Sequence, residues 1–169
     1  MYPKVYGAAG QKKLAQYPER FMQAQQLQDT IPNIQDLNLD ETGDLQSRLK
    51  RFYSELKAYE VSMRAVIGSY QSLIEEAERD CNKMEEVAMN TPPTAKPDRK
   101  FSLTTSIVQT RQQILFAKQQ CELLNQQIEN IVALKAEIKL AIAQNGLANL
   151  MPLLVQLKNQ DAEIRSTPK

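Results

Sequence analysis

The sequence predicts an all-α fold: a long antiparallel helical hairpin of the coiled-coil type, followed by a short third helix. Two stretches place apolar residues alternately three and four positions apart, which lets two helices pack along each other with interlocking side chains. A proline-rich segment at 90–97 separates them, and runs that favour β-strands are missing. The first series is Leu45, Leu49, Phe52, Leu56, Tyr59, Met63, Val66, Tyr70, Leu73 and Ala77, and the second is Leu103, Ile107, Thr110, Ile114, Ala117, Cys121, Leu124, Ile128, Ile131 and Ile138.

Residues 1–43 form a predicted leader, partly ordered, with one short helix at about 18–30. Pro18 suits the first turn of that helix, because the first N–H groups of a helix have no intrahelical partner in any case. The helix is expected to end at Ile31, since the residue before a proline avoids the α conformation. Gly10 favours a flexible start to the chain.

The first long helix is predicted over about 44–90. Asp40, Thr42 and Asp44 precede or open it and offer side-chain oxygens for an N-cap. Gly68 is its weak interior position, at a cost of about 1 kcal/mol relative to Ala. The helix is expected to end before the prolines, whose rings lack an N–H donor and clash with the preceding turn.

The second long helix is predicted over about 103–144, with Ser102 as its N-cap. Gly146 is typical of a position just past a helix end. A linker of about a dozen residues between two helices of matched length favours an antiparallel hairpin.

A shorter helix is expected at about 149–165, where Pro152 is tolerable in the first turn. Residues 166–169 are expected to be a loose tail. The sequence therefore predicts one helical bundle domain over 44–165, preceded by the leader.

The composition disfavours most catalytic and ligand-binding classes. The chain of 169 residues has no His, which removes the commonest general base and the commonest transition-metal ligand. Cys81 and Cys121 lie far apart and form no metal-binding pair of the CxxC type. The sequence also lacks a phosphate-binding glycine loop and a nucleophile elbow. We therefore expect no enzyme, no cofactor, no metal and no small-molecule substrate.

Charge and hydropathy bear on partners and location. Lys and Arg number 21 and Asp and Glu 20, a net charge of +1, so no overall field attracts nucleic acid or anionic lipid. A run of about 18 apolar residues is missing, and the start lacks the apolar core of a secretory signal. We therefore expect a cytoplasmic or nuclear protein with reduced thiols that contacts neither nucleic acid nor membrane.

The two long helices carry more apolar residues than a two-helix seam needs. Register counting places the extra side chains on the outer flanks, and exposed contiguous apolar area marks interfaces. The short third helix is expected to shield Tyr53, Val61, Val132 and Leu140 at the open end of the hairpin. The others are predicted to bind a helical partner, unless the leader covers them: Ile67, Ile74, Val108, Leu115, Phe116 and Leu123.

The second long helix also carries many uncharged polar residues. Glutamine is cheaper to desolvate than Lys or Glu, and charged residues are depleted at interface cores. Glutamine is equally a good helix former, so a plain solvated face remains an alternative. The residues are Gln109, Gln112, Gln113, Gln119, Gln120, Gln126 and Gln127.

These features predict a non-enzymatic structural or adaptor subunit that binds another helical protein, in a hetero-complex or as a homodimer. Cytoskeletal, cell-division and trafficking assemblies are built from such subunits. The heptad pattern resembles that of spectrin-like and BAR domains, although many unrelated proteins share it. A membrane-curvature module resembling BAR domains is one alternative, and a helical effector or chaperone from a pathogen or virus is another.

Three short sites suit protein kinases. Thr91 and Thr167 each precede a proline, and Ser102 follows a basic pair at 99–100. A phosphate on Ser102 is expected to lie at a helix N-terminus, where negative charge is favourable. The sequence therefore predicts possible regulation by phosphorylation at these three residues.

Overall fold

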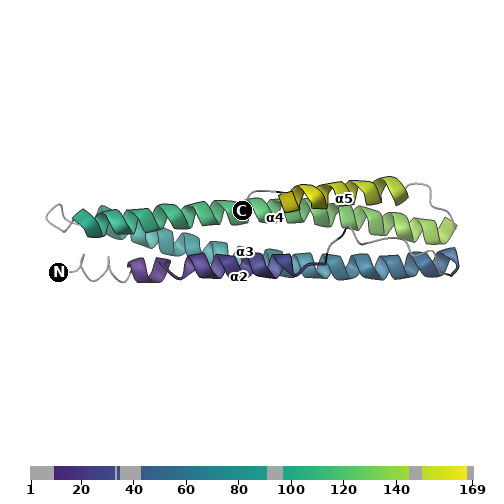
Figure 1. Cartoon of the computed structure of the whole chain (residues 1–169), viewed down its shortest axis with the longest axis horizontal. Coiled ribbons are helices and arrows are strands. Elements are labelled where there is room, and N and C mark those ends of the chain that lie inside the picture. The colour runs from purple at the N-terminus through teal and green to yellow at the C-terminus, as the bar shows by residue number, and fades with distance from the viewer. Residues whose placement is uncertain (1–9, 33, 35–42, 91–96, 145–149, 167–169) are drawn as a thin grey trace. The chain divides into compact units, whose positions relative to one another are not determined.

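Most of the chain that the structure describes is helical, and no strand occurs there (Figure 1). The structure is a computed structural model that describes residues 10–32, 34, 43–90, 97–144 and 150–166, with the backbone alone at 97–102. After a helical turn at 10–14, the helices are α2 (Tyr17–Asp29), α3 (Leu45–Met89), α4 (Pro97–Gln144) and α5 (Leu150–Ser166). The predicted all-α hairpin with a short C-terminal helix is confirmed.

Asp44, one of the three predicted N-caps, caps the N-terminus of α3. Its side-chain oxygens accept hydrogen bonds from the backbone N–H of Ser47 at 2.8 Å and from the Ser47 hydroxyl at 3.1 Å. The backbone bond from Ser47, followed by the hydroxyl bond, lowers the pKa of the Asp44 carboxyl. Gly43 precedes it at φ 90°, a conformation that side chains with a Cβ rarely adopt. Asp40 and Thr42 lie outside the described residues.

The start of α4 differs from the prediction. The helix begins at Pro97, six residues before the predicted start at Leu103, so Ser102 lies inside the helix and is not its N-cap. Proline is compatible with the first helical turn, where its fixed φ is already helical and no N–H donor is needed. Proline was treated as a helix breaker in the prediction, although in this position it is a helix start.

The described contacts group the chain into two compact units, and each long helix contributes one half to each. The first unit comprises Met1–Gln26 and Gly68–Gln119, and the second comprises Leu27–Ile67 and Gln120–Lys169. Each unit contains one half of α3, one half of α4 and a third helical segment. The third segment comes from the N-terminal region in the first unit and from α5 in the second.

In the first unit, α3 and α4 run antiparallel with a buried apolar seam. Glu85 pairs with Arg111 at 2.7 Å, and Glu78 pairs with Lys118 at 2.5 Å. Residues later in the sequence of α4 thus meet residues earlier in the sequence of α3. The predicted seam positions on both helices of this unit are buried. They are Tyr70, Leu73 and Ala77 on α3, and Leu103, Ile107, Thr110, Ile114 and Ala117 on α4.

The N-terminal segment packs on α3 in the first unit as a third helix. Lys13 pairs with Asp80 at 3.2 Å, the Tyr17 hydroxyl donates a hydrogen bond to the same carboxylate, and Leu14 and Phe21 are buried. Gly10 is also buried, and a Cβ there would overlap the sulfur of Met84. The expected flexibility at Gly10 is therefore wrong: this glycine permits a close approach of two helices.

In the second unit, most of the seam positions are also buried, and the apolar spacing shifts by one residue near Lys135. Leu134 is fully buried where the three-four pattern predicts residue 135, and Lys135 lies beside it, only 17% exposed. The Lys135 ammonium pairs with Glu60 at 3.0 Å and lies 5.3 Å from the centre of the Tyr53 ring. At position 135, an ion pair at the edge of the seam therefore takes the place of the apolar side chain that the spacing predicts.

The α5 helix packs on a different face of α4 from the one predicted. Asp161 of α5 accepts a hydrogen bond from Gln127 at 3.4 Å, and Asn130 is hydrogen-bonded to Gln160. Because α5 lies on this polar side, it leaves most of the residues it was expected to shield in contact with solvent. The exposed fractions are 62% for Val61, 47% for Val132 and 46% for Leu140, while Tyr53 is half-buried.

Replacing two glycines by alanine should change stability in opposite directions. A Cβ at Gly68 meets nothing within 4 Å, so Gly68→Ala should raise the free energy of unfolding by about 1 kcal/mol, the difference in helix propensity. Gly43→Ala should lower it by about 1–2 kcal/mol, because its positive φ is strained for alanine. Urea unfolding followed by circular dichroism measures both. Equal shifts for the two variants would contradict the assigned backbone conformations.

Candidate protein-binding surface

In the first unit, one face of α4 points away from its helical neighbours. Arg111 and Lys118 mark the side that meets α3, since both form ion pairs with it. The residues at the three heptad positions that face away from the buried seam are exposed or half-buried. Val108 is 50% exposed and Leu115 is 59% exposed. We call this set the α4 outer face: Thr105, Val108, Gln109, Gln112, Leu115, Phe116 and Gln119.

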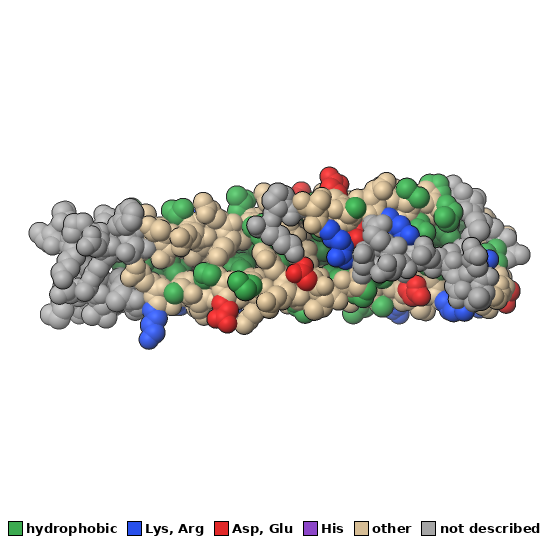
Figure 2. Space-filling view, in the orientation of Figure 1, with side chains coloured by type: hydrophobic (Ala, Val, Ile, Leu, Met, Phe, Trp, Pro, Cys, Tyr) green, Lys and Arg blue, Asp and Glu red, His purple; other side chains and the backbone are tan. Residues whose placement is uncertain are grey.

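The α4 outer face contains no charged residue. The same heptad positions on α3 in this unit are Gln71, Ser72, Glu75, Glu78, Arg79, Asn82, Glu85 and Glu86, of which five are charged. Along the N-terminal half of α4, hydrophobic side chains lie among uncharged atoms (Figure 2). The outward-facing positions of α3 and α4 in this unit therefore differ sharply in charge.

Of the six predicted partner-binding residues, three belong to the α4 outer face. Val108 and Leu115 are exposed, and Phe116 beside them is half-buried. Leu123, in the second unit, is half-buried as well. The register count therefore located the exposed part of α4 correctly in the first unit.

Ile67 and Ile74, predicted on the outer flank of α3, are instead buried at 6% and 7% exposure. In the first unit, Ile74 lies one helical turn before Glu78, which pairs with Lys118 of α4. In the second unit, Ile67 lies one heptad after Glu60, which pairs with Lys135 of α4. Both isoleucines thus share a face of α3 with residues that contact α4, because the contact is wider than two positions per heptad.

Two exposed apolar residues of the first unit were not predicted: Met89 at the end of α3, and Met22. Met22 of α2 is 56% exposed and lies in the uncharged run Phe21–Gln26. On α2, Arg20 pairs with Glu76 of α3, and Met22 follows two residues later, about 200° further round the helix, so Met22 lies on the other side. The signal that could have found it is the absence of charge in that run.

The predicted phosphorylation sites gain no structural support. Thr91 and Thr167 lie outside the described residues. The backbone at Ser102 is helical, in the second turn of α4 rather than at its first residue. The expected placement of a Ser102 phosphate at the helix N-terminus is therefore wrong by about one turn.

No protein family, curated protein or solved structure matches this chain. Its function must therefore be inferred from its own surface and contacts.

The described residues contain no candidate metal site. Within them, no cluster of three Cys, Asp or Glu side chains could hold a metal ion. None of the described helices combines the length and the apolar character needed to cross a lipid bilayer. Most of the buried polar side chains in the described part contact a neighbouring helix, as Asp80, Gln120, Gln127 and Asp161 do.

A buried polar cluster joins α2 to α3 in the first unit. The Asp80 side chain is 8% exposed and meets both Lys13 and the Tyr17 hydroxyl. Burial, together with the hydrogen bond to Asp80, raises the pKa of Tyr17, so this phenol stays protonated as a donor. Arg20 lies 5.3 Å from the centre of the Tyr17 ring and binds Glu76 through two nitrogens, at 2.9 and 2.6 Å.

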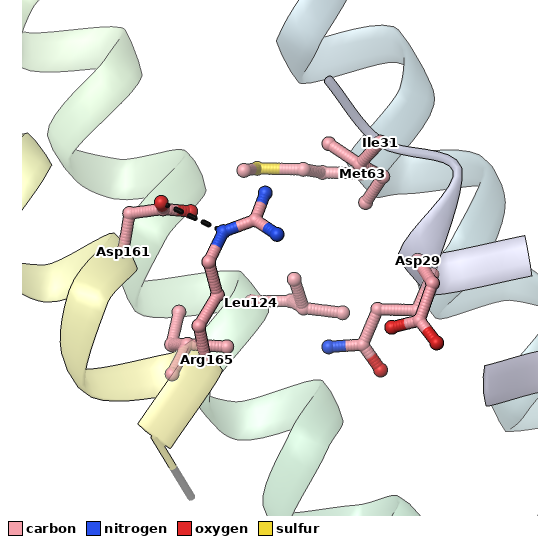
Figure 3. A pocket seen from close by; sticks show the side chains of 8 residues that line it. Asp29, Ile31, Met63, Leu124, Asp161 and Arg165 are labelled. Atoms are coloured by element: carbon pink, nitrogen blue, oxygen red, sulfur yellow. Dashed lines mark hydrogen bonds and ion pairs between the residues drawn. The ribbon is translucent and has the colours of Figure 1, made fainter. Parts of the chain in front are cut away.

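The second unit contains a small cavity of about 40 Å³ where α5 meets the other helices. Figure 3 shows the Arg165 side chain reaching into it between Asp161 and Met63. The Arg165 Nε donates to Asp161 at 3.0 Å. Such a volume is large enough for one or a few water molecules. The lining residues are Gln28, Asp29, Ile31, Met63, Leu124, Asp161, Ile164 and Arg165.

Acidification should weaken the contact between α2 and α3. The hydrogen bond from Arg20 lowers the pKa of Glu76 below its ordinary value of 4.5, so the contact stabilises the fold above that pH and is lost as the pH falls. The stability difference between the natural chain and Arg20→Gln should therefore shrink from about pH 6 to about pH 3. Urea unfolding at each pH measures it.

The double variant Arg20→Gln with Glu76→Gln provides the control for this pair. It should be no less stable than either single variant at neutral pH, because each single change already removes the interaction. Additive losses in the double variant would mean that the two residues act independently.

The two thiols should react slowly in the folded chain. Burial raises the pKa of the Cys81 thiol, and it raises that of Cys121 to about 11 from an ordinary value of 9.0. The thiolate fraction of Cys121 at about pH 8 should then be roughly 100-fold lower than in the unfolded chain. Alkylation by iodoacetamide, followed by mass spectrometry with and without urea, measures this. Equal rates in both conditions would show that the thiols are accessible.

Proposed function

We propose that this chain is a non-enzymatic structural or adaptor subunit that binds another helical protein through the α4 outer face. The observation that carries the proposal is the charge contrast within the first unit: α4 exposes Val108 and Leu115 among uncharged residues, whereas α3 exposes charges at the equivalent positions. Cytoskeletal, cell-division and trafficking assemblies are the kinds of complex in which such a subunit serves.

The energetics support binding at this face. Burying a large aliphatic side chain contributes about 1.5–3 kcal/mol, so Val108 and Leu115 supply a modest apolar core. The surrounding glutamines and Thr105 lose less free energy on desolvation than ionised side chains would. A helix laid along α4 could contact residues at the spacing of one heptad, as in other helix-to-helix recognition.

The neighbouring ion pairs support the rigidity of this face. Arg111 is held by Glu85 and by the Asn82 side chain at 2.9 Å, and Lys118 is held by Glu78. These contacts draw the two nearest cations toward α3 and away from the exposed arc. The proposal includes a cytoplasmic or nuclear location, which the two free buried thiols support.

A photo-crosslinking amino acid at residue 112 should capture the partner. We expect p-benzoylphenylalanine in place of exposed Gln112 to give discrete crosslinked products in cells, because it lies at the centre of the face. The same amino acid in place of exposed Glu75, on α3, serves as the control and should give few. Products of equal yield from both sites would contradict a specific face.

Leu115→Glu should remove these crosslinks without unfolding the chain, since it places a charge in the face at a residue that is 59% exposed. Val61→Glu is the matched control: Val61 is 62% exposed and lies outside the face. Retained crosslinking in Leu115→Glu, with circular dichroism unchanged, would overturn the proposed function.

A further inference from the structure

We infer that the α4 outer face pairs with the same face of a second copy of this chain, antiparallel and centred on Gln112. This inference rests on the proposed function, because it names the partner for that face. It follows from the order of residues along the face and from the absence of charge there.

The face is complementary to itself under a two-fold rotation about Gln112. In an antiparallel helix pair with this centre, residues equidistant from Gln112 face each other. Val108 then meets Phe116, and this apolar contact forms twice, once on each side of the axis. Leu115 meets Gln109, whose methylene groups are apolar.

Gln112 itself lies on the axis and meets its own counterpart. A primary amide carries both donors and acceptors, so two such side chains can exchange hydrogen bonds. An aspartate, glutamate, lysine or arginine at this position would instead face a like charge. The residue on the axis is therefore of a type that tolerates its own copy.

Charge selects this face over the other long helix in the first unit. Of the five charged residues at the equivalent α3 positions, Glu78 and Glu85 pair with α4, and the other three are Glu75, Arg79 and Glu86, so two copies of that face would bring charged side chains together. The α4 outer face brings no charge to the pairing. Arg111 and Lys118 on its border are already paired with Glu85 and Glu78.

The size of the face sets the expected affinity. From Thr105 to Gln119 the helix rises about 21 Å and is about 10 Å wide. That footprint is smaller than the roughly 800 Å² per partner of a stable interface. We therefore expect a weak dimer, with dissociation in the micromolar range or above, that responds little to salt.

A charge-swap experiment on the full chain tests the two-fold centre. Gln112→Lys and Gln112→Glu each place like charges on the axis, so each should weaken self-association by at least ~10-fold in analytical ultracentrifugation. An equimolar mixture of the two should regain it, because lysine then faces glutamate. Gln112→Ala is the control and should self-associate within about 3-fold of the natural chain, since it brings no charge.

Three results would overturn the inference: a natural chain that stays monomeric up to about 1 mM, single variants that associate as the natural chain does, or a mixture that stays monomeric. The crosslinking experiment keeps the two proposals apart. A monomeric chain whose crosslinks still depend on Leu115 leaves the proposed function standing with a different partner. Crosslinks that do not depend on Leu115 remove the proposed function itself.

Discussion

The width of the contact between α3 and α4 determines which residues are left for a partner. Helices of 45 and 48 residues need a neighbour along each turn, because most helical stability in proteins comes from packing an apolar face. On α3 the contact includes the flank that carries Ile74 in the first unit and Ile67 in the second, with Glu78 and Glu60 at its edges. In the first unit, α4 meets α3 through its seam and through Arg111 and Lys118, and the α4 outer face remains exposed or half-buried.

Buried polar contacts, beside the apolar ones, hold the third helical segment in each unit. In the first, the buried Asp80 binds Tyr17 and Lys13, and in the second, the buried Asp161 binds Gln127 and Arg165. A buried, paired carboxylate adds little net stability to the fold compared with an apolar residue. Leaving it without its partner is costly, however, so it disfavours shifted registers of the third helical segment. Gln127 Oε1 and Gln120 Nε2, both buried in the second unit, lack a protein partner among the described residues, which adds to the polar character of that core.

The hairpin could be predicted from the sequence because its apolar period is local and long. The start of α4 could not, because Pro97 closes a proline-rich segment and proline both breaks a helix and begins one. The burial of Ile67 and Ile74 was missed because heptad counting assigns two positions to a seam, whereas this one includes a third. The bond between Tyr17 and Asp80 joins residues 63 apart in sequence, and no local pattern indicates such a pairing. For the candidate site, Val108 and Leu115 were found by register alone.

The fold itself does not require the α4 outer face to be free of charge. Glutamine is a good helix former, but so are glutamate, lysine and arginine, and helix propensity alone does not separate them. The neighbouring α3 shows what the same unit tolerates at the same exposure: Glu75, Arg79 and Glu86 are all solvent-facing there. Charges at such positions favour solubility, and exposed apolar residues oppose it. The needs of folding therefore do not account for a surface that combines Val108 and Leu115 with uncharged neighbours, and this supports the proposal that the surface binds a protein.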